Sequence, residues 1–304
     1  MDNNDFGKIG LLERAIMVNW KHEGVYMRVF VTGATGNLGS SVVRELIQTG
    51  HQVIGLTRSD SGAVKLKKAG AEAHFGSLED PECLHKGASI ADGVIHLAFD
   101  FSNFAASLVI DLHAINAIGA VLENTGKPFL TTAHANGTAS DDATLALANR
   151  GVRSSVISLS PSVHDEVDHG FIPMLVNIAR TKGFSAYVED GANRWSAIHR
   201  LDASHLYCLA LEKAPAGSRL SGRGEEGIPF RDIAEAIGKQ LHKPVKSISR
   251  KEADAHFGFL GTLAAIDVSS AVPSNTVQTK ELLGWEPVHP GLIADIEQGY
   301  YFKN

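Results

Sequence analysis

Residues 28–39, Arg-Val-Phe-Val-Thr-Gly-Ala-Thr-Gly-Asn-Leu-Gly, decide the fold. The first half of this stretch is β-branched and aromatic, which predicts a short strand, and the second half is a glycine-rich turn. Residues 40–50 follow with apolar side chains spaced for one helical face. The stretch therefore predicts a strand, a tight turn and a helix in immediate succession.

The same alternation continues as far as residue 159. Further strands are predicted at residues 51–57, 71–75, 93–98, 129–133 and 154–159, with helices at 61–69, about 104–124 and about 141–149. Strands that alternate with helices in this way predict an α/β Rossmann fold with a doubly wound parallel sheet.

Beyond residue 160 the alternation weakens, and a small C-terminal substrate lobe is expected. Helical patterns recur there at residues 203–213, 230–241, 251–257 and 276–283. We therefore divide the chain into an N-terminal extension (1–26), a dinucleotide-binding domain (27–160) and a lobe with sheet-completing elements (161–304).

Composition restricts the partners. The net charge of −6 is spread over mixed residues without runs of one sign, which argues against a nucleic-acid or membrane surface and favours a small-molecule substrate. Two isolated cysteines, Cys83 and Cys208, fit a reducing compartment and no metal cluster. Without a secretory signal or a fully apolar span, we expect a cytoplasmic protein, and a monomer or weak dimer.

Three glycines mark a nucleotide site. Gly33, Gly36 and Gly39 have the spacing at which a strand-to-helix turn brings its backbone N–H groups to a pyrophosphate. The alternative is a tight turn that binds nothing, but the βαβ context favours a dinucleotide. The residues predicted to bind it here are Gly33, Thr35, Gly36, Asn37, Leu38 and Gly39.

The end of the second strand favours NADP. An NAD-preferring site places an acidic residue there, about 20 residues after the glycines, to bind the ribose 2′-hydroxyl. This chain has Arg58 at that place, whose guanidinium can bind a 2′-phosphate in a forked manner. The nearby Asp60 keeps NAD open as the alternative, and Arg58 could also be a solvated surface residue.

Other strand ends are expected to line the same cofactor. Ser77 and Leu78 follow the third strand and would face the adenine, whereas Leu97, Ala98 and Phe99 follow the fourth and would pass under the ribose and nicotinamide. Ordinary packing at the ends of strands is the alternative for all five.

Several longer motifs resemble one family. Residues 32–39, the strand at 92–98, Leu-Ser-Pro-Ser-Val-His at 159–164 and Leu-Leu-Gly-Trp-Glu-Pro at 282–287 together resemble the extended and atypical short-chain dehydrogenase/reductases. The resemblance is greatest to the group known as NAD-dependent epimerase/dehydratase, through residues 168–173 and 193–202. It implies that Ser160 and Val163 lie beside the nicotinamide.

The catalytic pair of that family is missing. It requires a tyrosine with a lysine four residues later, but none of the five tyrosines has one. Only 24 positions separate Thr132 from Val156 (156 − 132 = 24), a segment that is usually longer in related enzymes. The chain is shortened where the family places its catalytic pair.

A few residues remain as candidates for catalysis or substrate binding. Thr132 falls where the resemblance places a catalytic Ser or Thr, and His134 could supply a proton near neutral pH. Phe171, Trp195 and His199 could form an apolar pocket with a polar group. A turn hydroxyl, a structural histidine and core packing are the respective alternatives.

The cluster of acidic and histidine residues at 164–169 lacks the spacing of a zinc site, so we predict no metal. The leading hypothesis is an NADP(H)-binding reductase-like protein that acts on a small carbonyl or alcohol. A non-catalytic NAD(P)-binding sensor or scaffold is the first alternative, because the Tyr-x-x-x-Lys pair is missing, and an epimerase or dehydratase is the second.

Overall fold

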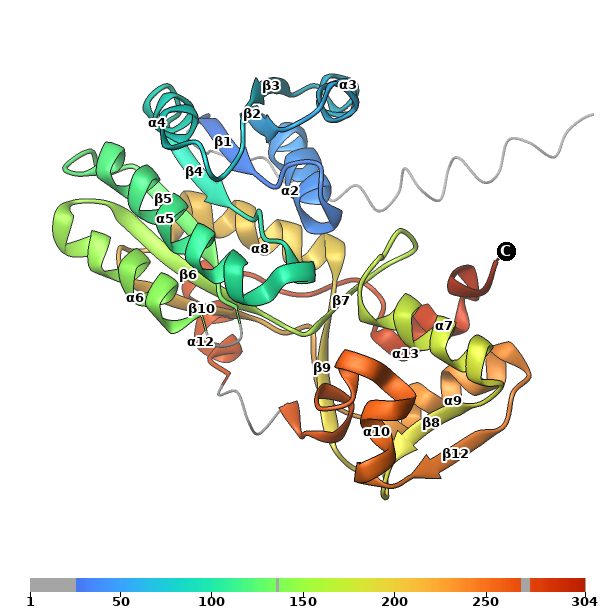
Figure 1. Ribbon diagram of the computed structural model, residues 1–304. Coiled ribbons are helices and arrows are strands. Elements are labelled where there is room, and N and C mark those ends of the chain that lie inside the picture. The colour runs from blue at the N-terminus through green and yellow to red at the C-terminus, as the bar shows by residue number, and fades with distance from the viewer. Residues whose placement is uncertain (1–25, 135–136, 269–273, 304) are drawn as a thin grey trace, which may run out of the picture.

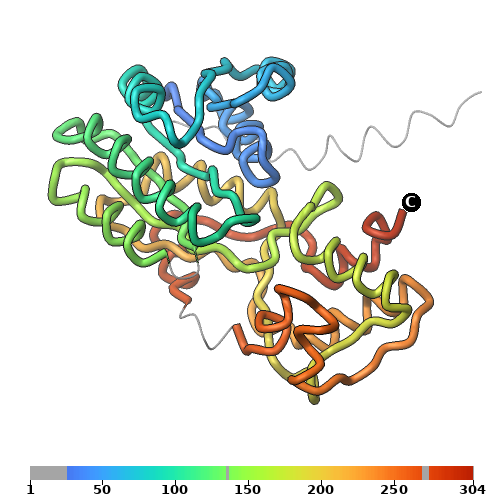
Figure 2. Tube along the Cα trace, viewed as in Figure 1, coloured from blue at the N-terminus to red at the C-terminus, as the bar shows by residue number. Residues whose placement is uncertain are grey.

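The computed structural model describes residues 26–134, 137–268 and 274–303. They form a Rossmann half and a smaller lobe, at upper left and lower right in Figure 1. The predicted extension at 1–26 lies outside the described residues except for Tyr26. Figure 2 shows the chain crossing between the two halves more than once, so neither half is one continuous stretch of sequence.

A seven-stranded parallel sheet forms the centre of the Rossmann half. The strand order is β10-β6-β5-β4-β1-β2-β3, which reverses direction between β1 and β4. Ligands of such sheets bind at the carboxyl ends of the strands beside that reversal. The strands are β1 (Arg28–Thr32), β2 (Gln52–Thr57), β3 (Glu72–Phe75), β4 (Gly93–His96), β5 (Pro128–Thr132), β6 (Arg153–Leu159) and β10 (Ser218–Gly222).

Helices cover both faces of this sheet, as expected for a doubly wound fold (Figure 1). One core joins α2 and α8 to the sheet, and a second core joins α4 and α5 to the opposite face, where α6 packs beside α5. The helices of this half are α2 (Asn37–Gln48), α3 (Asp60–Ala69), α4 (Pro81–Ser89), α5 (Phe104–Leu122), α6 (Thr138–Ala146), α8 (Arg200–Lys213) and α12 (Thr276–Leu283), with 3-10 turns η1 (Phe101–Asn103) and η2 (Leu147–Arg150).

The long helix α5 is unusually apolar. Together with η1 it spans Phe101–Leu122 and, by length and composition alone, could cross a membrane, with a mean hydropathy of 1.7. It packs against α4 and α6. Its single carboxylate, Asp111, is buried, so a charged group lies inside the protein halfway along this helix.

The lobe has a separate hydrophobic core. A three-stranded sheet of order β11-β9-β7 and the pair β12-β8 frame it. Its elements are β7 (Ser162–His164), α7 (Phe171–Lys182), β8 (Ser185–Val188), β9 (Arg194–His199), β11 (Glu225–Pro229), α9 (Phe230–Leu241), β12 (Val245–Ile248), α10 (Arg250–Phe257), η3 (Gly258–Leu260), η4 (Leu263–Ala265), α13 (Leu292–Glu297) and η5 (Tyr300–Phe302).

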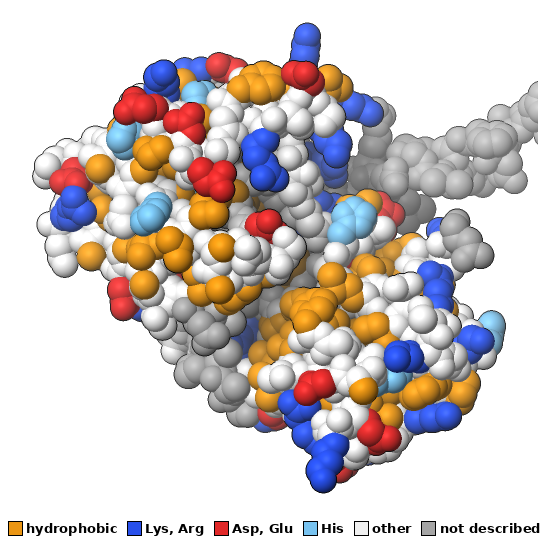
Figure 3. Space-filling view, in the orientation of Figure 1, with side chains coloured by type: hydrophobic (Ala, Val, Ile, Leu, Met, Phe, Trp, Pro, Cys, Tyr) orange, Lys and Arg blue, Asp and Glu red, His pale blue; other side chains and the backbone are white. Residues whose placement is uncertain are grey.

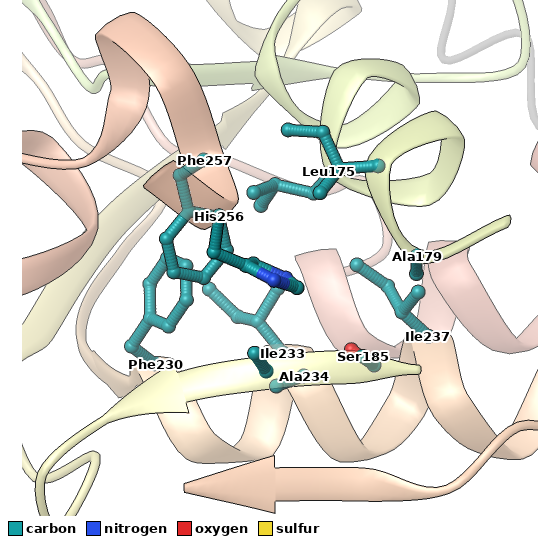
Figure 4. Close-up of a pocket in the computed structure, with 11 residues that line it drawn as sticks. Leu175, Ala179, Ser185, Phe230, Ile233, Ala234, Ile237, His256 and Phe257 are labelled. Carbon is teal, nitrogen blue, oxygen red and sulfur yellow. The ribbon is translucent and has the colours of Figure 1, made fainter. Parts of the chain in front are cut away.

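A small cavity lies inside the lobe core, between α7, α9 and α10. Figure 4 shows His256 pointing into it between Leu175 and Ile237. Its volume is about 10 Å³, close to the minimum that holds one water molecule. The cavity is therefore too small for an organic substrate.

Candidate functional site

The glycine turn between β1 and α2 forms a close-fitting cradle. Gly33 adopts φ +67°, and a Cβ there would lie 2.7 Å from the backbone nitrogen of Ala98. A Cβ at Gly39 would overlap the carbonyl oxygen of Gly33, whereas one at Gly36 would come within 3.1 Å of it. Gly36 itself is exposed. The turn therefore leaves its backbone open at Gly36, while Gly33 and Gly39 allow the strand and helix to pack closely.

The first turn of α2 presents unsatisfied polar groups at the cradle. The helix begins at Asn37 after Gly36, and no side chain caps its first N–H groups. The side-chain oxygen of Asn37 is buried and has no hydrogen-bond partner among the described residues. Free N–H groups at a helix N-terminus bind anions, so this turn fits a dinucleotide pyrophosphate.

Arg58 follows β2 at the same edge of the sheet. Its side chain is exposed, while Thr57 before it is buried. Hydrogen bonds from Ser102, together with the nearby positive charge of Arg58, lower the pKa of Asp100. Arg58 thus lies within electrostatic reach of the segment after β4. The nearby Ser59 caps α3 by accepting a hydrogen bond from the N–H of Gly62, 3.1 Å away.

The other predicted cofactor residues lie at neighbouring strand ends. Ser77 and Leu78 follow β3, and the Ser77 hydroxyl accepts a hydrogen bond from the N–H of Glu79. Leu97, Ala98 and Phe99 follow β4, where the first two donate their N–H groups to the hydroxyl of Thr32. Ser160 lies between β6 and β7, and Val163 lies within β7. The fold thus gathers the residues after β1 to β4 and β6 along one edge.

Thr132 ends β5, and its hydroxyl lies 2.6 Å from the phenol of Tyr207. Tyr207 is fully buried in α8, and burial raises the pKa of its phenol, an effect that the bond to Thr132 only partly offsets. The phenol therefore stays neutral and cannot reach a substrate. No local pattern predicts this contact, because it joins residues 75 positions apart in the chain.

His134 follows β5 and belongs to a buried polar chain with residues of β1, β4 and α5. Its Nε2 lies 3.8 Å from Oδ1 of Asp111, which in turn lies 3.0 Å from Nε2 of His96. The Nδ1 of His96 lies 2.7 Å from the hydroxyl of Thr32. Burial alone would raise the pKa of Asp111, but the polar contacts with His134 and His96 outweigh it and lower that pKa.

Comparison with known proteins places the chain in a family. Residues 26–120 match the model of the NmrA-like family. An uncharacterised protein of Schizosaccharomyces pombe is 44% identical over 299 residues, which cover 91% of this chain and 100% of the relative. The chain belongs to the extended short-chain dehydrogenase/reductase superfamily.

Other relatives and a solved structure are more distant. A Stigmatella aurantiaca protein named as a 4-hydroxy-2-methyl-3-oxo-4-farnesyl-3,4-dihydroquinoline-1-oxide ketoreductase is 27% identical over 225 residues, covering 63% of this chain and 66% of the relative. The crystal structure of a dTDP-glucose 4,6-dehydratase of Streptomyces venezuelae with NAD bound superposes with a TM-score of 0.70 at 17% identity, covering 90% of this chain and 96% of that one. At that identity the likeness shows the Rossmann fold.

Arg200 joins the cradle to the lobe. The guanidinium is buried, and its Nη1 donates to the carbonyl oxygen of Asn37 over 3.0 Å. Its Nε donates over 2.5 Å to Asp165, which follows β7. The first turn of α2 and the loop that opens the lobe are thereby held by one side chain.

The predicted lobe residues do not all lie together. Trp195 is fully buried in the lobe core, where its indole donates to the carbonyl oxygen of Leu263. Phe171 is partly buried at the start of α7, with its ring 6.0 Å from that of Trp195. His199 ends β9 in a separate polar cluster. Trp195 can therefore shape a site only through neighbours such as Phe171.

His199 stacks on His289 with ring centroids 4.7 Å apart. Burial and the charge of His289 lower the pKa of His199 to about 4, so its ring is neutral at physiological pH. Asp202 accepts hydrogen bonds from the ring of His289 and from its backbone N–H. These contacts clamp the C-terminal segment onto α8.

Two triads have the spacing of metal ligands, His199–Asp202–His289 and His51–Cys208–Glu212. In each triad the polar atoms already bond to one another or to neighbouring groups. Two acids of the loop at 164–169 are also engaged, since Asp165 pairs with Arg200 and Asp168 accepts from the N–H of Gly170.

Proposed function

We propose that this protein is an NADP(H)-dependent oxidoreductase that interconverts the carbonyl and alcohol forms of a small apolar molecule. The observation that carries the proposal is the position of Thr132 and His134. Thr132 ends β5 and His134 follows it, at the same edge of the sheet as a glycine cradle that fits a dinucleotide. A bound nicotinamide dinucleotide would supply or accept the hydride, and the protein would orient the carbonyl group.

NADP rather than NAD is supported by Arg58. No acidic residue ends β2, and an exposed guanidinium stands there instead, free to pair with a 2′-phosphate. The cradle residues Gly33, Gly36, Asn37 and Gly39 would hold the pyrophosphate through backbone N–H groups.

Thr132 would orient the substrate oxygen. The phenol of Tyr207 is fully buried and faces the Thr132 hydroxyl. When the phenol donates to this hydroxyl, the hydrogen of Thr132 is left for a carbonyl oxygen. Alignment of this kind is a large part of the catalysis of hydride transfer.

The substrate would lie in the hollow between the two halves. Figure 3 shows hydrophobic side chains gathered on the side of the lobe that faces the Rossmann half. An apolar wall opposite a few polar groups is typical of sites for small organic ligands. This arrangement favours an apolar carbonyl compound over a sugar nucleotide.

The proposal is tested with purified protein, NADPH and a panel of aromatic and aliphatic aldehydes and ketones. We expect oxidation of NADPH that depends on the carbonyl compound. A protein that binds NADPH but turns over none of these compounds would favour a non-catalytic NAD(P)-binding sensor or scaffold, which the missing Tyr-x-x-x-Lys pair also favours.

A further inference from the structure

We propose that His134, held by Asp111, donates the proton to the carbonyl oxygen and so replaces the tyrosine that the chain lacks. The inference rests on the proposed function and deepens it. It starts from the carboxylate of Asp111, which is 2% exposed and faces two imidazoles. A buried carboxylate is stable only with a positive or hydrogen-bonding partner, so this group requires the rings around it.

The contacts differ between the two rings. Oδ1 of Asp111 is shared by Nε2 of His96 and Nε2 of His134, while Oδ2 accepts no hydrogen bond from the described residues. The other nitrogen of His96 is occupied by the Thr32 hydroxyl. His96 is therefore held through both ring nitrogens, whereas His134 makes its contact with Asp111 through Nε2, so we assign its Nδ1 to the ligand.

The surroundings of His134 suit a proton donor. Its side chain is 9% exposed, and its ring stacks on that of Phe99 with centroids 3.9 Å apart. Phe101 lies edge-on at 6.1 Å and is 69% exposed. Phe99 lies three residues after β4, at the edge of the sheet where the cofactor is expected, so His134 and the aromatic surface lie beside that edge. That surface favours a carbonyl attached to an aromatic or other apolar group.

The chemistry balances. The carbonyl carbon accepts a hydride from the reduced nicotinamide cofactor, which is thereby oxidised, and the carbonyl oxygen accepts a proton from the His134 imidazolium. The alcohol leaves, and the neutral imidazole regains a proton from water. A carboxylate behind an imidazole stabilises the imidazolium form, as in Ser-His-Asp triads.

The charged groups around His134 come from two helices. Asp111 faces it from α5, and Asp141 faces it from α6, close enough for the charge of His134 to act on the pKa of Asp141. Burial is the main cause that raises the pKa of Asp141, and Arg219 pairs with that carboxylate on its outer side. The pH dependence of catalysis must therefore be compared between matched variants.

The experiment compares wild type, His134→Gln, Asp111→Asn and the control His113→Gln. The control alters an exposed histidine of α5, the helix that carries Asp111. With NADPH and benzaldehyde as probes, we expect His134→Gln to lower kcat at least about 100-fold, the usual contribution of general acid catalysis. NADPH affinity should change less than about 3-fold, and His113→Gln should match wild type. The pH dependence of kcat/KM should differ between wild type and His134→Gln, and identical pH profiles would contradict the assignment.

If wild type turns over the probe and His134→Gln does so at a rate within about 3-fold of wild type, the inference is wrong and the proposed function still stands. Binding of NADPH without turnover of any probe by wild type would overturn both. A readout without cofactor is the nitrogen NMR spectrum of His134. We expect hydrogen on Nε2, and a loss of that preference in Asp111→Asn; hydrogen on Nδ1 in wild type would contradict the assignment.

Discussion

The guanidinium of Arg200 lies 2.5 Å from the carboxylate of Asp165, and both side chains are almost fully buried. Removal of one partner leaves an uncompensated charge, so we expect Arg200→Met and Asp165→Asn each to lower the free energy of unfolding by about 3–5 kcal/mol. The double variant should lose less than the sum. Urea unfolding measures all three.

The exposed pair Lys239–Glu297 provides the control for this comparison of single and double variants, since its side chains are 71% and 46% exposed. Lys239→Met should cost less than about 1 kcal/mol. Additive losses at Arg200 and Asp165 would show that the two side chains do not hold the halves together as a unit.

The buried carboxyl group of Asp168 should make the stability of the folded protein depend on pH. Burial, only partly offset by the hydrogen bond from Gly170, raises the pKa of its carboxyl from 3.8 to about 6. Between these values the unfolded chain has released this proton and the folded chain has kept it, so the contribution of Asp168 to stability falls as pH rises from about 4 to about 6.

Asp168→Asn keeps the oxygen that accepts from Gly170 and removes the charge. We expect the variant to be more stable than wild type by about 2–3 kcal/mol above pH 7, because one pKa unit corresponds to about 1.4 kcal/mol. The two proteins should be equally stable near pH 4. Thermal unfolding at both pH values tests this, and a constant difference would contradict it.

Substitutions of Thr132, which hydrogen-bonds to Tyr207, distinguish a positioning role of Thr132 in catalysis from a structural role. We expect Thr132→Ala to lower kcat about 100- to 1000-fold, as the loss of one oriented donor does. Thr132→Ser, which keeps the hydroxyl, should recover most of that rate. If Thr132→Ala leaves turnover unchanged, Thr132 has no part in the reaction.

Phe101 tests the expected substrate class. It is 69% exposed, so its truncation to Ala should cost little stability. We expect Phe101→Ala to raise KM for benzaldehyde about 5-fold or more, since aromatic pairs contribute about 0.5–1.5 kcal/mol beyond their buried area. KM for a small aliphatic aldehyde should stay the same, and equal changes for both would argue against stacking.

The sequence predicted the Rossmann half well, because its signals are local. The glycine spacing, the β-branched runs and the apolar helical face at 40–50 each follow from neighbours in the chain. Helix α4 was missed although Asp80 and Pro81 form a proper start for it, with the Asp80 carboxylate accepting from the N–H of Cys83. The helical patterns predicted for the lobe also do not include α7 (Phe171–Lys182).

The site was predicted only in part, because its key contacts join distant residues. Thr132 meets Tyr207 across 75 positions, and Arg200 meets Asn37 across 163. Asp111 did leave a trace, as the single acid within the apolar stretch 104–122. A buried carboxylate requires partners, so that trace pointed to a polar contact, but only the fold shows that His96 and His134 supply it.

The central claim, that the glycine cradle and Arg58 hold NADP(H), is tested most directly by calorimetric titration with NADPH and NADH. Wild type, Arg58→Ala, Gly36→Val and the control Lys68→Ala, an exposed residue at the end of α3, are compared. We predict that wild type prefers NADPH, and that Arg58→Ala loses at least about 10-fold of NADPH affinity with little change for NADH. Gly36→Val should lose both, and Lys68→Ala neither. Equal losses of both cofactors in Arg58→Ala would contradict the NADP assignment, and unchanged binding in Gly36→Val would contradict the site itself.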